Sequence, residues 1–351
     1  MYKKIIILLI IVCFPFFAFA KASSTIVMEV NSGRVLYENN ANSKRLIASI
    51  TKIMTCIIVL ENVEISSQVT VGDEVLNSYG TNIYIKPGEI LTVEDLLYGL
   101  MLRSGNDAAS TLAVYTSGSE EEFVKLMNDK AKKIGMNNTI FNNPHGLDDK
   151  TENYSTAYDM ALLSRYAYQN ETYRKIISTK KYETKSSLKS YVWYNRVSLL
   201  NSYDNCIGGK NGYTPKAGKT LVSLAKKDNL LLTVVTLNDD NIYEHHEKLY
   251  EEFFDRYHYF KIVDRNSFRI NPSLIFDKNV FIRNDFYYPL SDDEIEKIST
   301  FIRIDDSNKE KVGRIEINFD NKKIGEIPIF QENKKEDKKS IFHWLKKLFV
   351  W

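Results

Sequence analysis

Cysteine is scarce in this sequence, with three among 351 residues. Cys13 lies in an N-terminal apolar run, so Cys56 and Cys206 are the two that remain for the body of the chain. Two thiols are too few for a cysteine-ligated metal site. A disulfide between them is one interpretation. We favour the other, a buried and inert Cys56 within the apolar run from Ile53 to Leu60.

A strong charge of one sign is also missing. The 47 lysines and arginines are balanced by 45 aspartates and glutamates, which leaves a formal net charge of +2. Neither a basic stripe nor a nucleic-acid motif is present, so we expect no nucleic acid as a partner. Internal repeats and long low-complexity segments are absent too. With 44% hydrophobic and 26% charged residues, the chain has material for two globular domains.

The N-terminus has the pattern of a signal peptide. Lys3 and Lys4 precede an apolar run over 5–20 that ends in Ala18-Phe19-Ala20, the small-x-small pattern that signal peptidases cleave. The run is short for a membrane span, which needs about 20 residues. We therefore predict a signal peptide over 1–20, with an uncleaved anchor as the alternative. Both interpretations predict export.

The C-terminal residues 331–351 change character. A polar stretch over 333–339 leads into an amphipathic segment over 341–351. On a helix one face would carry Ile341, Trp344, Leu345, Leu348 and Phe349. Lysines point away from that face, as in helices that lie in the plane of a membrane surface. We predict a polar tether and a membrane-anchor helix; a helix packed on the protein's own core is the alternative.

Between these ends, the pattern predicts an α/β layer structure followed by a small all-β domain. Alternation over 24–37 indicates a hairpin, and strands return after about residue 190, with a final helix over 243–257. Helix starts are indicated by three capping boxes, at Thr92-x-x-Asp95, Ser119-x-x-Glu122 and Thr156-x-x-Asp159. Short strands separated by turns fill 264–330. We place the domains at 21–262 and 263–330.

The first candidate for chemistry is Ser49-Ile50-Thr51-Lys52, at the start of a predicted helix. Residues three apart share a helix face, so Lys52 lies within reach of the Ser49 hydroxyl. A nucleophilic serine needs a base, and lysine is a base only where burial or a nearby cation lowers its pKa. Taken alone, this pattern is more often an N-capping serine and a solvated lysine.

Two later segments combine polar residues with glycine. Ser104-Gly105-Asn106 follows the predicted helix over 92–102, in a loop that lets both polar side chains point into one cleft. A helix cap is the alternative. The glycine-rich stretch 206–214 leads into strands, where glycine often marks the close approach of a ligand or another backbone. A plain hairpin turn would explain an isolated case equally well.

In combination, the order S-x-x-K, S-x-N and K-x-G resembles the serine penicillin-recognising enzymes. The chain is similar to low-molecular-mass penicillin-binding proteins of the D-alanyl-D-alanine carboxypeptidase type over 39–55, 85–100, 104–109, 143–148 and 155–161. The resemblance covers about residues 24 to 330. It implies an α/β (α+β) fold: a β-lactamase/transpeptidase-like domain with a helical subdomain, then a small all-β domain and a C-terminal amphipathic helix.

The resemblance also implies catalytic roles. Ser49 would attack the terminal D-Ala-D-Ala bond of a peptidoglycan stem peptide, and water would then hydrolyse the acyl-enzyme. Lys52 would be the base for acylation, and Ser104 would pass a proton toward the leaving amine. The backbone N–H groups of Ser49 and Tyr213 would form the oxyanion hole. No cofactor is implied.

Substrate binding is implied for a second set of residues. Asn106 would bind the substrate amide and hold Lys52, while Lys210 would supply positive potential and attract the terminal carboxylate. The implied substrate-binding set is Asn106, Lys210, Asn211, Gly212, Tyr213 and Thr214. His145 is interpreted as structural. His245 and His246 are adjacent on a helix and cannot both face one metal, so we predict no metal site.

Two positions depart from the family pattern. Asn211 stands where relatives carry threonine in the third motif, although a carboxamide can still donate to a carboxylate, and Thr214 could take part of that contact. No arginine follows the strand that ends near Leu237, where many relatives have one facing the carboxylate. Arg196 is the nearest upstream arginine, and the sequence assigns it no role.

The leading hypothesis is therefore a D,D-carboxypeptidase that trims stem peptides and limits cross-linking, at the outer face of the cytoplasmic membrane. β-Lactams would be acylating inhibitors. The alternatives are a weakly active or inactive penicillin- or peptidoglycan-binding protein, indicated by Asn211 and the missing arginine, and a β-lactamase. A β-lactamase needs an efficient deacylation base, which these motifs do not identify.

Overall fold

The computed structural model describes residues 23–269, 279–305 and 310–331. They form two compact units. The larger comprises 23–28, 35–225 and 233–247, and the second comprises 29–34, 226–232 and the described residues from 248 onward. The predicted signal peptide and the predicted tether and membrane-anchor helix lie outside the described residues. Within the described ranges, no helix is long and apolar enough to cross a membrane.

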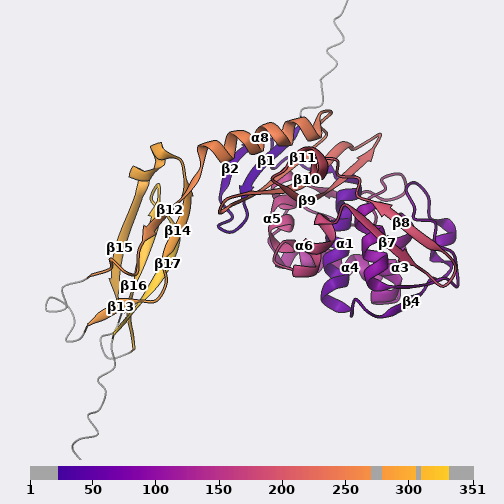
Figure 1. Ribbon diagram of the computed structural model, residues 1–351, viewed down its shortest axis with the longest axis horizontal. Helices are drawn as coiled ribbons and strands as arrows, with labels where there is room; N and C mark the ends of the chain where they lie inside the picture. The colour runs from indigo at the N-terminus through magenta and orange to yellow at the C-terminus, as the bar shows by residue number, and fades with distance from the viewer. Residues whose placement is uncertain (1–22, 270–278, 306–309, 332–351) are drawn as a thin grey trace, which may run out of the picture. The chain divides into compact units, whose positions relative to one another are not determined.

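The larger unit is built on a five-stranded sheet with the order β2-β1-β11-β10-β9 (Figure 1). The strands are β1 (Ser24–Glu29), β2 (Val35–Asn39), β9 (Cys206–Thr214), β10 (Gly218–Lys227) and β11 (Leu230–Leu237). The predicted hairpin is β1 and β2, which pair antiparallel. All eight residues of β11 are buried, as expected of a strand covered on both faces.

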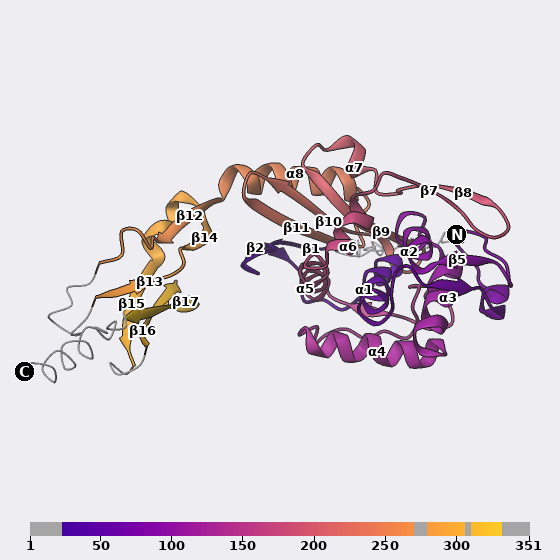
Figure 2. The ribbon, with the colours of Figure 1, turned by 60° about the horizontal axis from the view of Figure 1, so that its bottom comes forward.

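Helices lie on both faces of this sheet (Figure 2). They are α1 (Lys52–Asn62), α2 (Val93–Leu102), α3 (Asn106–Ser117), α4 (Glu120–Lys133), α5 (Ala157–Ala167), α6 (Glu171–Ser178), α7 (Leu199–Ser202) and α8 (Ile242–Arg256), with the short 3-10 helices η1 (Ala48–Thr51) and η2 (Asp73–Asn77). Opposite faces of β11 meet α8 and α5: Thr236 is hydrogen-bonded to His246, and Thr233 to Ser164. Mixed layers of this kind agree with the predicted α/β (α+β) fold.

The helix starts follow the predicted caps. Thr92 and Asp95 form a reciprocal capping box at α2. The Ser119 and Thr156 side chains cap α4 and α5 by accepting from backbone N–H groups three residues on. α4 ends two residues before Gly135, which has φ +86°. A glycine in this left-handed conformation ends a helix without steric strain.

Helix α1 is the centre of the larger unit. Every residue from Lys52 to Val59 is buried, so its apolar run packs on all sides. Cys56 is one of these residues, and both it and Cys206 are free thiols, so the disulfide interpretation is wrong. Burial raises the pKa of the Cys206 thiol to about 11, and it also raises the pKa of Cys56. Both are inert at neutral pH.

Three two-stranded sheets support the loops of the larger unit. They pair β3 (Arg45–Leu46) with β6 (Tyr154–Ser155), β4 (Gln68–Thr70) with β5 (Ile90–Thr92), and β7 (Lys181–Lys185) with β8 (Ser190–Tyr194). The hairpin of β7 and β8 packs Tyr182 on Tyr98 of α2, with ring centroids 3.7 Å apart. It ends just before Arg196.

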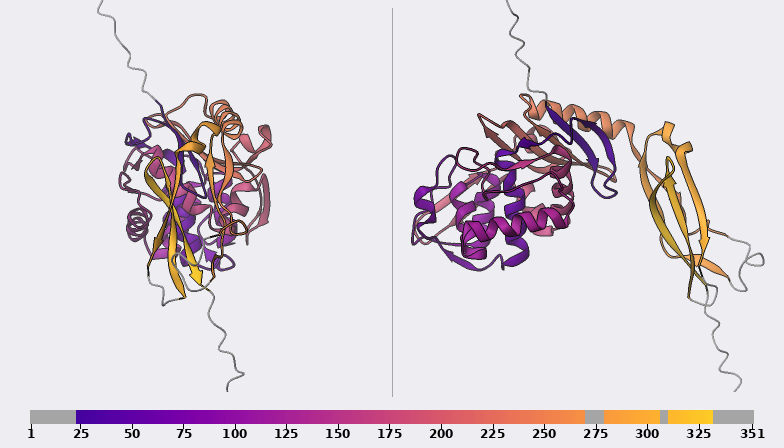
Figure 3. Two further views of the ribbon diagram at one scale, coloured as in Figure 1. Left: turned by 90° about the vertical axis from the view of Figure 1, so that its left-hand side faces the viewer. Right: turned by 180° about the vertical axis from the view of Figure 1, so that it is seen from behind.

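The second unit is rich in strands (Figure 3). A two-stranded sheet and a four-stranded sheet of order β13-β17-β16-β15 comprise β12 (His258–Val263), β14 (Phe286–Leu290), β13 (Val280–Ile282), β15 (Ile298–Ile304), β16 (Lys311–Phe319) and β17 (Lys322–Gln331). Its core includes Val312, Ile317 and Ile329, which are fully buried. The predicted domain boundary at 262 and 263 stays a prediction.

Candidate active site

Ser49 lies in the 3-10 turn η1, directly before α1 begins at Lys52. The sequence predicted Ser49 in the first turn of a helix, and the tighter turn still places both side chains together. Lys52 Nζ is 3.1 Å from Ser49 Oγ, 2.7 Å from Asn106 Oδ1 and 2.6 Å from the His145 carbonyl oxygen. Ala48 has φ +49°, so the backbone is strained beside the serine.

Lys52 is fully buried. Burial is the main cause that holds the pKa of its amine well below the usual value, and the positive charges of Lys210 and Arg196 lower it further. Asp107 opposes them by raising this pKa. A neutral lysine amine has two N–H donors and one lone pair. Asn106 Oδ1 and the His145 carbonyl oxygen can only accept, which uses both N–H donors of the neutral amine. Its lone pair is then left for the Ser49 hydroxyl, which can donate its proton to it.

The second motif holds Asn106 at the first position of α3, after Gly105. Its Oδ1 accepts from Lys52, while its Nδ2 donates to the Tyr79 carbonyl oxygen at 2.7 Å. Ser104 has φ +64°, an uncommon conformation for serine. Its hydroxyl is buried and has no hydrogen-bond partner among the described residues. In this motif the Asn106 side-chain amide therefore makes hydrogen bonds through both its oxygen and its nitrogen. The Ser104 hydroxyl makes none among the described residues.

The third motif lies on β9. Lys210 is fully buried, and its Nζ donates to the Asn211 carbonyl oxygen at 2.7 Å. Burial lowers the pKa of Lys210 to about 7, with Arg196 as a second cause. Gly212 is needed for contact with the nucleophile turn, because a Cβ there would lie 2.7 Å from the Ser49 nitrogen. The strand therefore passes directly alongside Ser49.

The other predicted residues of this motif differ in their surroundings. Tyr213 is exposed, and its backbone follows Gly212 along the same strand. Asn211 is half-buried and donates through Nδ2 to the Tyr243 hydroxyl. Thr214 is buried; its hydroxyl donates to Asp148 and accepts from the Ala217 N–H. Thr214 is therefore already occupied in holding the turn between β9 and β10.

The loop over 143–148 braces the nucleophile turn. Pro144 contributes its carbonyl oxygen, which accepts from Thr55 of α1 at 2.6 Å, and the carbonyl of His145 accepts from Lys52. Burial, followed by the charge of Lys52, lowers the pKa of His145 to about 3. Its neutral imidazole accepts from the Leu147 N–H, which agrees with a structural role. The sequence did not reveal that its carbonyl contacts the base.

Asp107 is a second residue whose part in the site the sequence did not reveal. It is buried at the start of α3, and its carboxylate accepts from the N–H groups of Ile83, Tyr84 and Ile85. These bonds shape the loop that also supplies the Tyr79 carbonyl to Asn106. The available signal was an aspartate in the first helical turn, which is a common feature of helices.

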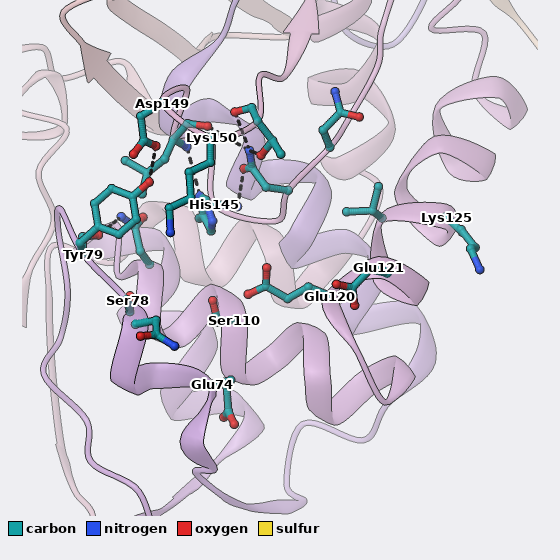
Figure 4. Close-up of a pocket in the computed structure, with 17 residues that line it drawn as sticks. Glu74, Ser78, Tyr79, Ser110, Glu120, Glu121, Lys125, His145, Asp149 and Lys150 are labelled. Carbon is teal, nitrogen blue, oxygen red and sulfur yellow. Dashed lines mark hydrogen bonds between the residues drawn. The ribbon is translucent and has the colours of Figure 1, made fainter.

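Asn106 and His145 also line a cavity of about 600 Å³ (Figure 4). Its walls carry Glu74, Glu120 and Glu121. Burial raises the pKa of Glu120, and the neighbouring glutamates add to that effect. Tyr79 donates to Asp149 at one rim of the cavity. The cavity therefore shares two residues with the Lys52 cluster, although Ser49, Lys52 and Lys210 do not line it.

Residues 18–241 match the profile of a protein family described as D-alanyl-D-alanine carboxypeptidase. The chain belongs to this family. A curated member, the D-alanyl-D-alanine carboxypeptidase DacF of Bacillus subtilis, is 35% identical over 255 residues, which cover 70% of this chain and 65% of that protein. DacC of Escherichia coli is 38% identical over 228 residues, which cover 62% of this chain and 56% of that protein. The alignments thus span about two thirds or less of these carboxypeptidases.

Two solved structures extend the similarity to most of the chain. The D-alanyl-D-alanine carboxypeptidase DacD of Francisella tularensis aligns with TM-score 0.70 and 25% identity, covering 95% of this chain and 96% of that one. Penicillin-binding protein 5 of Haemophilus influenzae aligns with TM-score 0.72 and 26% identity, covering 88% and 96%. The predicted family is confirmed, and so is the predicted fold class up to the small β domain; the predicted C-terminal amphipathic helix lies outside the described residues.

Proposed function

We propose that this chain is a serine D-alanyl-D-alanine carboxypeptidase that removes the terminal D-alanine from peptidoglycan stem peptides and so limits cross-linking. One observation carries the proposal: the buried amine of Lys52 lies between Ser49 Oγ, Asn106 Oδ1 and the His145 carbonyl oxygen. Family membership and the relatives' names support the reaction class. The proposed substrate, a peptide that ends in D-Ala-D-Ala, is taken from those names.

Acylation begins with the neutral Lys52 amine. Ser49 Oγ attacks the carbonyl carbon of the terminal peptide bond, and the Ser49 proton passes to Lys52 Nζ. In this proposal the oxyanion that forms accepts from the Ser49 and Tyr213 N–H groups. The support is the close approach of β9 to the nucleophile turn, where a Cβ on Gly212 would lie 2.7 Å from the Ser49 nitrogen. A neutral Lys52 can take this proton at neutral pH because burial has lowered its pKa.

Collapse of the tetrahedral intermediate breaks the C–N bond. The leaving amine needs one proton, and the Ser104 hydroxyl, which has no partner among the described residues, relays it from Lys52. D-Alanine leaves, and the acyl group stays on Ser49. Water then attacks the ester carbon and loses a proton to the site, and Ser49 recovers its own proton. Asn106 and Lys210 bind the substrate amide and carboxylate.

β-Lactams acylate the same serine in this proposal, because they present a reactive amide carbonyl beside a carboxylate. We also propose that the protein is exported and acts at the outer face of the cytoplasmic membrane. The support is the sequence of residues 1–20 and 341–351, which lie outside the described residues. Deleting 341–351 should release the protein from membranes. Persistent attachment of that variant would point to an uncleaved N-terminus.

The test of activity uses the full chain in detergent with diacetyl-Lys-D-Ala-D-Ala, and it measures released D-alanine. Ser49→Ala is the control, since it removes the nucleophile. Release that does not exceed this control would reject the enzyme proposal. Labelling with a fluorescent penicillin tests the nucleophile separately. Labelling without peptide hydrolysis would instead indicate a penicillin-binding protein without carboxypeptidase activity.

A further inference from the structure

Asn211 is tied to a residue of α8 that the reaction scheme does not use. Asn211 Nδ2 donates to the Tyr243 hydroxyl at 3.2 Å, and that hydroxyl donates to the Arg196 carbonyl oxygen at 3.1 Å. The three residues come from β9, the first turn of α8 and the segment after β8. Tyr243 therefore joins the third motif to the only arginine whose charge acts on both Lys52 and Lys210 in the described structure.

The directions of these hydrogen bonds fix the orientation of the Asn211 amide. A tyrosine hydroxyl has one proton, and here the Arg196 carbonyl can only accept, so Tyr243 donates to it. Tyr243 must then accept from Asn211, which requires the NH₂ group of Asn211 to face it. One N–H of that group is used, and the second has no partner among the residues that the structure describes, so it is available for a ligand. Without Tyr243, the amide could rotate and present its oxygen instead.

The surroundings of Asn211 favour an anion. Lys210 precedes it on β9, and Gly212, which follows it, is in contact with the Ser49 turn. Arg196 is exposed and, among the described residues, has no carboxylate partner; its NH1 donates to Thr81 Oγ1 at 3.4 Å. Asn211 thus lies between a buried lysine and the glycine that contacts the Ser49 turn, and an N–H donor close to cations suits a carboxylate.

We propose that Tyr243 is a positioning residue for substrate recognition: it holds the Asn211 carboxamide with an N–H directed at the terminal carboxylate of the D-Ala-D-Ala substrate. This inference rests on the proposed function. In this proposal Asn211 makes the contact with the substrate carboxylate that the threonine of the third motif makes in relatives. This role also explains why an asparagine at this position needs a hydrogen-bond partner to orient its amide. A threonine hydroxyl rotates freely and would need no such partner.

The experiment compares the wild type with Tyr243→Phe, Asn211→Thr and the double variant. Two peptides are used, diacetyl-Lys-D-Ala-D-Ala and its C-terminal amide, and the shortened product is quantified by chromatography. Tyr115→Phe is the matched control, because Tyr115 is an exposed tyrosine on α3, and no hydrogen bond of its hydroxyl occurs within the described structure. Thermal unfolding confirms that each variant is folded.

We expect Tyr243→Phe to lower kcat/KM for the free acid by roughly 3- to 10-fold, which is the loss of one hydrogen bond, mainly through a higher KM. The amide should change less than about 2-fold. In the Asn211→Thr background, Tyr243→Phe should have no further effect on the acid. Equal losses on both peptides, or a persistent loss in the threonine background, would overturn the inference and leave Tyr243 as a structural brace.

The proposed function can fail independently of this inference. If the wild type hydrolyses neither peptide, the same four variants are acylated with benzylpenicillin and with its methyl ester, which lacks the carboxylate. Slower acylation of Tyr243→Phe by the acid alone would support the positioning role without any peptidase activity. Equal rates with the acid and the ester in every variant would reject it.

Discussion

Gly146 lies directly against the nucleophile turn, and replacing it perturbs the site without touching a catalytic side chain. Its φ is +92°, and a Cβ there would lie 2.0 Å from the Ala48 carbonyl oxygen and 2.9 Å from Thr51 Oγ1. The first of these neighbours is backbone, which cannot swing aside. Gly146→Ala must therefore push the 143–148 loop away from Ala48, the residue that precedes Ser49.

Substitutions at two other glycines serve as controls, because they carry the cost of a left-handed backbone conformation without the cost of a steric clash. Gly88 and Gly118 have φ +80° and +83°, and no atom lies within 4 Å of a Cβ built on either. An alanine in this conformation costs about 1 to 2 kcal/mol. Overpacking a buried contact costs about 1 to 3 kcal/mol more. We expect Gly88→Ala and Gly118→Ala to lose only the first amount of unfolding free energy, and Gly146→Ala to lose both.

The assays are urea unfolding and the second-order rate of acylation by a fluorescent penicillin. Gly88→Ala and Gly118→Ala should acylate at the wild-type rate. Gly146→Ala should be slower by about 10-fold or more, because displacing reacting groups by about 1 Å can cost a factor of 100. If Gly146→Ala unfolds and acylates like the two other variants, the loop does not brace Ser49 and this reasoning is refuted.

Three further predictions concern charge and stability. Arg196→Gln removes a cation that lowers the pKa of Lys52, so that pKa should rise and the acid limb of the acylation pH profile should move to higher pH; an unmoved limb would contradict this. Thr92→Ala removes the α2 cap and should lower the unfolding free energy by about 1 kcal/mol in urea. Arg34→Met breaks the nearly buried pair with Glu294, 2.6 Å apart, and should destabilise the second unit by about 3 kcal/mol in calorimetry while D-alanine release persists.

Local patterns predicted the helix starts, because a cap and its N–H partner are only three residues apart. Thr92 and Asp95 form the expected reciprocal box. At α5 the Thr156 cap is present, but the Asp159 carboxylate accepts from the Asn138 N–H and the Thr139 hydroxyl instead. The loop at Asn138 and Thr139 thus uses the Asp159 carboxylate, which the sequence pattern assigned to the N-terminal cap of α5. Sequence spacing cannot reveal such competition from a distant segment.

The sequence predicted those site residues that belong to the three motifs, because the combination of motifs is uncommon. Ser49, Lys52 and Asn106 meet as expected, although 54 positions separate Lys52 from Asn106. The contacts of Asp107 and Tyr243 were not predictable. An aspartate in a first helical turn and a tyrosine on an amphipathic helix are ordinary features. Only tertiary packing brings Asp107 to the backbone N–H groups of the 83–85 loop and Tyr243 to Asn211.

The two buried lysines are distinguished by their surroundings rather than by their type. Both are fully buried, which disfavours their charged forms, yet the pKa of Lys210 falls to about 7 while that of Lys52 falls well below its usual value. Burial is the first cause for both lysines, and the charge of Arg196 lowers both pKa values. Lys52 has a further cause, the charge of Lys210, which Asp107 opposes. Environments that push two pKa values apart assign different roles to the groups. Lys52 loses its proton first and is suited to be the base, whereas Lys210 keeps a substantial share of its charge near neutral pH for the carboxylate.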